Sequence, residues 1–174
     1  MTRKKRQYEL IRVLSTRENR AVYLAHLLGF GGFRRTVALR SIQGGIEERE
    51  REIENAKLCA MLSHTNIVQI LDVGQHEHGW FVAMEYVDGP SLEQLIEEAE
   101  KQKAEIPVQL IIYILSETLK ALEYAHRRTL PESEERGIAH NNLNPRNVLV
   151  NFQGGVKVNG FSASPQPGRH LPPE

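Results

Sequence analysis

The sequence predicts an α+β fold in which an N-terminal antiparallel sheet of five strands is followed by a mainly helical part. Three observations support this prediction. Segments rich in β-branched and aromatic residues recur through the first half of the chain, separated by polar or glycine-containing turns. One charged helical pattern follows Gly44-Gly45, and two longer helical patterns occupy the second half. Strands followed by helices are typical of α+β domains.

The strands are expected in short segments bounded by turn residues. They cover residues 8–14, 21–27, 36–42, 67–73 and 79–86. The first two should form a hairpin, and a turn over 74–79 should join the last two. The glycine-rich segment 29–32 could be mistaken for a phosphate-binding loop. No helix follows it, so a hairpin turn is the better interpretation.

Three helices are expected. The first runs over about 47–62 and has one face to bury, formed by Ile46, Ile53, Ala56 and Ala60. Ser91 and Gln94 have the spacing of a capping box, which predicts a polar helix from there to about residue 103. Pro107 suits the first position of a helix over 107–128. This helix has too many apolar positions for one stripe and must be covered on more than one side. A loop over 129–136 and a strand over 137–139 should follow.

Composition limits the function. The 174 residues, 40% hydrophobic, can bury one substantial core. Lys+Arg and Asp+Glu both total 22, which gives no general attraction to nucleic acid or to a membrane. The basic residues 3–6 are interpreted as a solvated terminal run. No apolar run approaches the roughly 20 residues that span a bilayer, so we expect a cytoplasmic protein. Cys59 has no disulfide partner, and the His76 and His78 pair suits a turn better than a metal site.

A motif near the C-terminal end carries the strongest functional signal. The segment 140–150, His-Asn-Asn-Leu-Asn-Pro-Arg-Asn-Val-Leu-Val, resembles the protein-kinase catalytic loop H-R-D-L-x-x-x-N. Other kinase motifs are matched in the right order by 37–40 (V-A-I-K), 62–68 (after helix C), 83–89 (the hinge) and 156–162 (the strand into D-F-G). Over residues 8–174 the chain is therefore similar to the bacterial eukaryotic-like serine/threonine kinases.

This resemblance implies a kinase-like fold with an incomplete C-terminal lobe. Residues 1–7 form a basic tail, 8–87 the N-lobe and hinge, and 88–174 a partial C-lobe with helices D and E and the catalytic loop. The expectation is that the chain lacks helices F to I and ends at an A-P-E-like motif over 169–174.

No catalytic motif is intact in this alignment. Asn142 replaces the Asp that accepts the substrate proton, and Gly160 replaces the Asp that holds magnesium, which leaves Asn147 as the matching metal position. Arg40 replaces the lysine of V-A-I-K. Counting back from His64 places Asn55 where helix C supplies its glutamate, with Glu54 one residue, or about 100°, away. The motif-equivalent positions are thus Asn142, Asn144, Arg40 and Asn55.

The nucleotide pocket is expected to be degenerate. Ser15, Arg17 and Arg20 occupy the three positions of the glycine-rich loop, where glycine allows close approach to phosphates. The resemblance places a possible pocket at Val22, Ala38, Arg40, Met84, Glu85, Val87 and Leu149. It places the column that joins the lobes at Cys59, Ile70, His140 and Phe161. No cofactor is expected; if ATP binds, it should bind without strong dependence on magnesium.

These observations favour a catalytically inactive pseudokinase that serves as a binding, scaffold or regulatory module. Two alternatives stay open: an ATP-binding sensor or very weak serine/threonine phosphotransferase, which could use Arg17, Arg20, Arg40 and Asn147, and a truncated, decaying kinase reading frame. The helix at 107–128 should present an exposed apolar face, including some of Ile111, Ile112, Leu115, Leu119 and Leu122. A protein partner or a second copy should cover it; neither nucleic acid nor membrane is expected as a partner.

Overall fold

A computed structural model describes residues 7–17, 20–76, 79–128 and 137–162. The chain divides into two compact units. The first contains Met1–Ala60 and Gln69–Tyr86, and the second contains Met61–Val68 and Val87–Glu174. The expected 129–136 loop, the A-P-E-like end, the tail before Gln7 and His78 lie outside the described residues.

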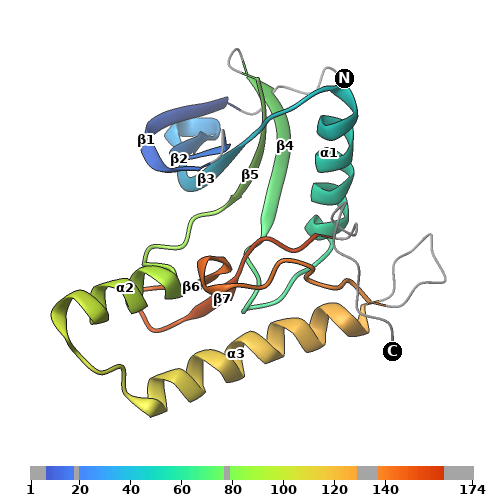
Figure 1. Ribbon diagram of the computed structural model, residues 1–174. Helices are drawn as coiled ribbons and strands as arrows, with labels where there is room; N and C mark the ends of the chain where they lie inside the picture. Colours follow the sequence, from blue (N-terminus) through green and yellow to red (C-terminus); the bar gives the residue numbers. More distant parts are fainter. Residues whose placement is uncertain (1–6, 18–19, 77–78, 129–136, 163–174) are drawn as a thin grey trace. The chain divides into compact units, whose positions relative to one another are not determined.

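The first unit is built on the predicted five-stranded antiparallel sheet, in the order β1-β2-β3-β5-β4 (Figure 1). Its strands are β1 (Gln7–Arg17), β2 (Arg20–Leu28), β3 (Arg34–Ile42), β4 (Ile70–His76) and β5 (Gly79–Glu85). The glycine-rich segment is the predicted hairpin connection between β2 and β3, and it contains a single 3-10 turn, η1 (Phe30–Gly32). The expected turn over 74–79 is too long, because β4 continues to His76.

Each face of this sheet has its own apolar core. On one face, the buried side chains are Ala25, Val37, Leu39, Phe81 and Ala83, with the ring of Tyr8 edge-on to Phe81. On the other face, helix α1 (Ile46–Ala60) packs through Ala56 and Ile53 against Ile42, Val82 and β4 (Figure 1). The alternation of side chains along strands produces this division. The buried face predicted for α1 is therefore confirmed at its centre, while Ile46 and Ala60 at its two ends are exposed.

The second unit contains helices α2 (Leu92–Gln102) and α3 (Val108–Arg127). The capping box is formed as predicted: the Gln94 amide N–H donates to Ser91 Oγ, and the Gln94 side chain accepts from the Ser91 N–H. Pro107 is the N-cap of α3 rather than its first residue. Two short strands, β6 (Val148–Val150) and β7 (Val156–Val158), pair antiparallel, and Val148 and Val156 pack on Ile114 of α3.

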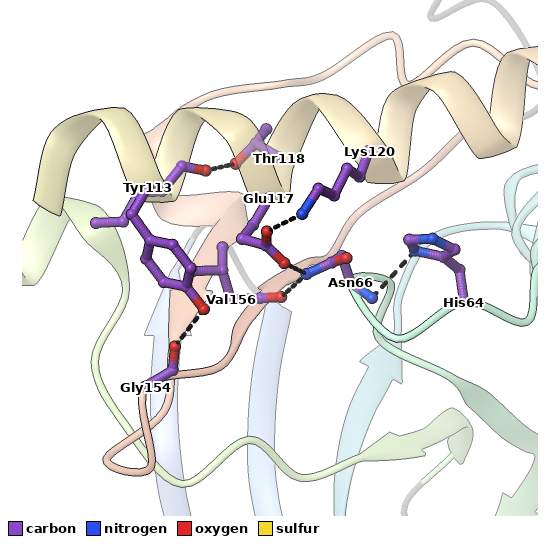
Figure 2. Close-up of polar contacts among 9 residues, drawn as sticks. His64, Asn66, Tyr113, Glu117, Thr118, Lys120, Gly154 and Val156 are labelled. Carbon is purple, nitrogen blue, oxygen red and sulfur yellow. Dashed lines mark hydrogen bonds and ion pairs between the residues drawn. The ribbon is translucent and has the colours of Figure 1, made fainter. Parts of the chain in front are cut away.

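Residues 66–68 belong to this second unit, which corrects the strand expected over 67–73. The Val68 N–H donates to the carbonyl of Val158 and the Val158 N–H to the carbonyl of Asn66, so this segment pairs with β7, and β4 begins only at Ile70. Figure 2 shows the buried Asn66 carboxamide donating to Glu117 Oε2 on α3 (2.8 Å) and to the Val156 carbonyl (2.9 Å). One asparagine thus ties the segment to both a helix and a strand.

Residues 137–139 form no strand, contrary to expectation. Instead, Gly137 and Ile138 donate their N–H groups to the carbonyls of Arg128 and Ala125 at the end of α3. Gly137 has φ +90°, and a Cβ there would lie 2.4 Å from the His126 carbonyl oxygen. Glycine is required at this position for both reasons.

Helix α3 is only partly covered. Its buried positions are Ile114, Thr118, Ala121 and Ala125. Its large exposed side chains are Val108, Leu110, Ile111, Ile112, Tyr113, Leu115 and Leu119. Leu122, predicted to belong to this face, is half-buried. Across the described parts of the chain, no helix is both long and apolar enough to cross a membrane.

Candidate functional site: a charged pair and an asparagine-rich loop

The predicted pocket residues of the first unit share one face of its sheet. Val22 and Val82 are register partners of Arg40, and Leu24 and Met84 are register partners of Ala38. Because side chains alternate along a strand, Val22, Ala38, Arg40 and Met84 all point to the α1 side. Ala38 and Met84 are buried.

The remaining predicted pocket residues are divided between the two units, with Glu85 in the first and Val87 and Leu149 in the second. Glu85 ends β5, where its N–H and side chain both bond to Gln69. Val87 is buried and belongs to the second unit, as does the half-buried Leu149, which bridges to Ser91.

Arg40 is paired with a helix carboxylate, which corrects the alignment that placed Asn55 in that role. Arg40 Nη1 lies 2.8 Å from Glu52 Oε2, and Arg20 Nη2 lies 2.9 Å from Glu52 Oε1. Glu54 pairs with Lys57 instead and does not reach Arg40, as expected. The Asn55 carboxamide accepts a long contact from Cys59 Sγ.

The sequence contained a signal for Glu52. Glu52, Ala56 and Cys59 follow an i, i+4, i+7 spacing, and Ala56 and Cys59 are buried, so Glu52 lies on the buried stripe of α1. Counting back from His64 by the family spacing reached Asn55 and did not identify Glu52.

The shared carboxylate is held in its ionised form. Burial raises the pKa of Glu52. The guanidinium groups of Arg40 and Arg20, through charge and hydrogen bonds, lower the pKa by more than burial raises it, so the net pKa lies below 4.5. The three side chains carry one net positive charge. Arg20 takes part although the motif alignment assigned it to a glycine position of the phosphate loop.

In the second unit, the side chains of Asn144 and Asn147 bond to the backbone of Asn142. Asn147 Nδ2 donates to the Asn142 carbonyl at 2.8 Å, and Asn144 Nδ2 donates to the same oxygen at 2.9 Å. Asn144 Oδ1 accepts from the Arg146 N–H and caps the 3-10 turn η2 (Pro145–Asn147). The predicted catalytic-loop positions are therefore brought together, but as a set of amides. Asn142 offers no basic carboxylate to a substrate hydroxyl.

Gly160 lies directly against Asn147. Its φ is +80°, and a Cβ built there would lie 3.0 Å from Cγ and Nδ2 of Asn147. Among the described residues, no three Asp, Glu, His or Cys side chains are grouped as metal ligands. Magnesium prefers carboxylate and phosphate oxygens, so this donor set does not fit it.

The buried side chain of His140 contacts the backbone on both sides of the loop. Its Nε2 lies 2.9 Å from the Asn159 carbonyl, and its Nδ1 lies 3.2 Å from the Asn142 N. A neutral ring with the proton on Nε2 satisfies both contacts. Burial lowers the pKa of His140 below 6.5, which favours that neutral form. The ring also packs on Phe161, with centroids 4.4 Å apart.

Comparison with known proteins places the chain in a family. The protein kinase domain model matches residues 34–170, so the chain belongs to the protein kinase family. It is 37% identical over 131 residues to the probable serine/threonine-protein kinase PknB of Lactococcus lactis, covering 73% of this chain and 19% of that protein. It is 29% identical over 158 residues to the tyrosine-protein kinase MasK of Myxococcus xanthus, covering 88% of this chain and 24% of that protein.

Solved structures agree with the fold. The kinase domain of Mycobacterium tuberculosis PknI matches with a TM-score of 0.69 and 28% identity, covering 92% of this chain and 61% of that one. The chain thus has the protein-kinase fold over a partial length, and it spans about a fifth to a quarter of these two curated relatives.

Proposed function

We propose that this chain is a protein kinase-like binding or scaffold module that does not transfer phosphate. The observation that carries this proposal is the contact between Gly160 and Asn147. In our alignment, Gly160 stands where the family has its metal-binding carboxylate, and it has a positive φ and no side chain that could bind a metal. Phosphoryl transfer depends on positioning and on neutralisation of phosphate charge by metal ions. A site made of amides supplies neither a metal ligand set nor a general base.

The cost of these replacements can be estimated. Loss of general-base help is worth roughly 10²–10⁴ in rate. Loss of preorganised charge stabilisation costs on the order of 10²–10³ more. Against a typical kinase turnover of about 1–100 s⁻¹, the best remaining rate is roughly 10⁻² s⁻¹.

The test is incorporation of labelled phosphate by purified protein, into itself and into generic substrates. We expect none, and none after Asn142→Asp, because a restored base still lacks a held metal. Magnesium-dependent incorporation that disappears in Asn147→Ala would refute the proposal.

A second function, nucleotide binding without magnesium, is favoured by the Arg20–Glu52–Arg40 group. Guanidinium groups bind phosphate bidentately, and this group retains one net positive charge next to the apolar residues Val22 and Ala38. Thermal shift with ATP, with magnesium and with EDTA, separates the cases. If ATP raises the melting temperature equally with magnesium and with EDTA, and Arg40→Ala abolishes the rise, nucleotide binding is supported. A rise that requires magnesium contradicts our assignment of Gly160.

The proposed partner surface is the exposed apolar face of α3. Ile112, Leu115 and Leu119 are each more than half exposed. Burying such side chains is worth about 1.5–3 kcal/mol each, so a protein surface that covers them would stabilise the chain substantially. We expect light scattering to show a dimer, a complex or aggregates. The double variant Leu115→Gln, Leu119→Gln should shift the measured mass toward that of a monomer. A wild-type monomer across micromolar concentrations, without binding of an apolar dye, would contradict this.

A further inference from the structure

The exposed apolar side chains of α3 include a set with a regular spacing. Val108, Ile112, Leu115, Leu119 and Leu122 follow one another at intervals of four, three, four and three residues. The first four are each more than half exposed, and Leu122 is half-buried. This alternation keeps apolar side chains on one line along a helix, which is the pattern through which one helix packs against another. We call these five residues the α3 seam.

The surface beside the α3 seam is elongated. An open groove of about 810 Å³ extends along the helix from Ile112 to Arg127, and four of the five seam residues line it. At 1.5 Å per residue, this length of helix is about 22 Å. The core contacts of α3, such as those of Ile114, use a different side of the helix, where β6 and β7 lie (Figure 1). A second helix therefore fits this surface better than a compact ligand.

The charges before and at the end of α3 have opposite signs. Residues 97–105, which precede the helix, contain four glutamates and two lysines. Residues 120–128, at its end, contain Lys120, Arg127 and Arg128 with one glutamate, Glu123. Two copies of α3 packed antiparallel would bring the acidic end of each copy toward the basic end of the other. A parallel pair would instead place arginines beside arginines, so the charges favour the antiparallel arrangement.

We propose that two copies of this chain pack antiparallel through the α3 seam, with a two-fold axis between Leu115 and Leu119. In this arrangement, Leu115 of one copy faces Leu119 of the other, and Ile112 faces Leu122. A two-fold contact uses the same surface on both copies, so the seam and the charges at its ends are complementary to themselves. The proposal rests on the partner surface of the proposed function and specifies what covers it.

Light scattering of the full chain tests the second copy. We expect twice the mass of a single chain at micromolar concentrations. The double variant Leu115→Gln, Leu119→Gln should weaken the dimer roughly a hundredfold or more, because four seam side chains in the dimer no longer gain from leaving water. Leu110→Gln is the matched control, since it changes an exposed leucine of the same helix outside the seam. It should dimerise like the wild type.

Disulfide cross-linking tests the antiparallel direction. The variants Ile112→Cys and Leu122→Cys are oxidised separately and after mixing. The two positions are about 15 Å apart along α3, whereas a disulfide joins Cα atoms about 4.4–6.8 Å apart. We therefore expect a cross-linked dimer from the mixture and from neither variant alone. The wild type, whose Cys59 is buried, is the control and should not cross-link.

Several outcomes would overturn the proposal. Cross-linking of Ile112→Cys alone would indicate a parallel pair, and a dimer that cross-links in no sample would indicate a different interface. Equal weakening by Leu110→Gln, or aggregates without a defined mass, would show that the seam is not specific. A monomer that binds an apolar dye would exclude the second copy and leave the partner surface to a different protein. Phosphate transfer is measured separately, so none of these outcomes changes the test of catalysis.

Discussion

The Arg40–Glu52 ion pair of the first unit keeps the charges that the kinase motif has there, whereas the asparagine loop of the second unit, residues 142–147, does not. Arg40 keeps a positive charge, and Glu52 on the neighbouring helix pairs with it at 2.8 Å. In the second unit, the two positions aligned with family carboxylates, Asn142 and Gly160, are neutral, and the Asn147 side chain donates to the Asn142 carbonyl.

The difference follows from the partners that are available to a carboxylate at each site. The carboxylate of Glu52 is paired inside its own unit, so its removal would leave two arginines uncompensated. A carboxylate at position 160 would lie against the uncharged carboxamide of Asn147. Without a metal, it would be an uncompensated charge next to Asn147. Glycine and amides remove that cost while keeping the loop bonded.

The strongest expected effect concerns the polar anchor of the second unit rather than either site. Asn66→Ala removes donors to Glu117 and to the Val156 carbonyl at a buried position. We expect unfolding free energy to fall by about 2–4 kcal/mol, since each buried group left unpaired costs about 1–3. Asn66 Oδ1 is itself buried without a partner within the described structure, which lowers the loss somewhat.

Tyr113→Phe is the matched control, because it removes one exposed hydrogen bond to the Gly154 carbonyl. It should cost no more than about 1 kcal/mol. Urea unfolding of both variants measures this. Equal losses would show that Asn66 is not a buried anchor.

Next in size is Glu52→Ala, which tests whether the first unit needs its charged pair. The expected loss is about 1–3 kcal/mol, less than for a fully buried pair because Arg20 is largely exposed. Glu54→Ala, which breaks an exposed pair with Lys57, should lose at most about 0.5 kcal/mol.

The contribution of Glu52 to stability should also depend on pH. The pKa of Glu52 is lowered from 4.5, so its contribution is complete above pH 4.5 and is lost as the pH falls through the folded-state pKa. The stability difference between wild type and Glu52→Gln should therefore shrink in acid. A difference that stays constant below pH 4.5 would argue against an ionised Glu52.

Sequence patterns predicted the five-stranded sheet and the three helices, because alternation, capping and turn residues act locally. Ser91 and Gln94 formed their box because both partners lie within one turn of helix. The strand expected over 67–73 was partly wrong for the opposite reason. Its apolar pattern allows pairing with any strand, and residues 66–68 pair with β7, about 90 positions later.

The charged site was predicted less well than the fold. Arg40 was predicted to be the lysine-equivalent position, but Glu52, its partner in the structure, was missed, since a motif count fixes helix phase only if the spacing is unchanged. Arg20 was recognised as a lost glycine and not as a partner of that carboxylate. Ion pairs depend on three-dimensional reach, which spacing alone does not encode.

A smaller effect is expected when a carboxylate is returned to the second unit. Gly160→Asp places a side chain at φ +80°, which costs about 1–2 kcal/mol, and its Cβ approaches Asn147. Gly154→Asp is the control, because φ there is +88° but nothing lies within 4 Å of an added Cβ. Thermal and urea unfolding should show a larger loss for Gly160→Asp. If Gly160→Asp is as stable as wild type and gains a magnesium-dependent shift, the loop has kept a metal site.

The smallest expected effect is the pH response of His140. Its two contacts, to Asn159 and Asn142, are both satisfied by the neutral ring, and protonation would direct Nδ1–H at the Asn142 N–H. Burial lowers its pKa below 6.5, so the unfolded chain takes up a proton first as the pH falls. The stabilisation is therefore complete above pH 6.5 and declines below it. Urea unfolding between pH 7.5 and about pH 5, before most carboxylates titrate, should show this decline in wild type. It should be reduced in His140→Gln and unchanged in His126→Gln, which removes an exposed imidazole at the end of α3. An identical decline in all three proteins would exclude His140 as its source.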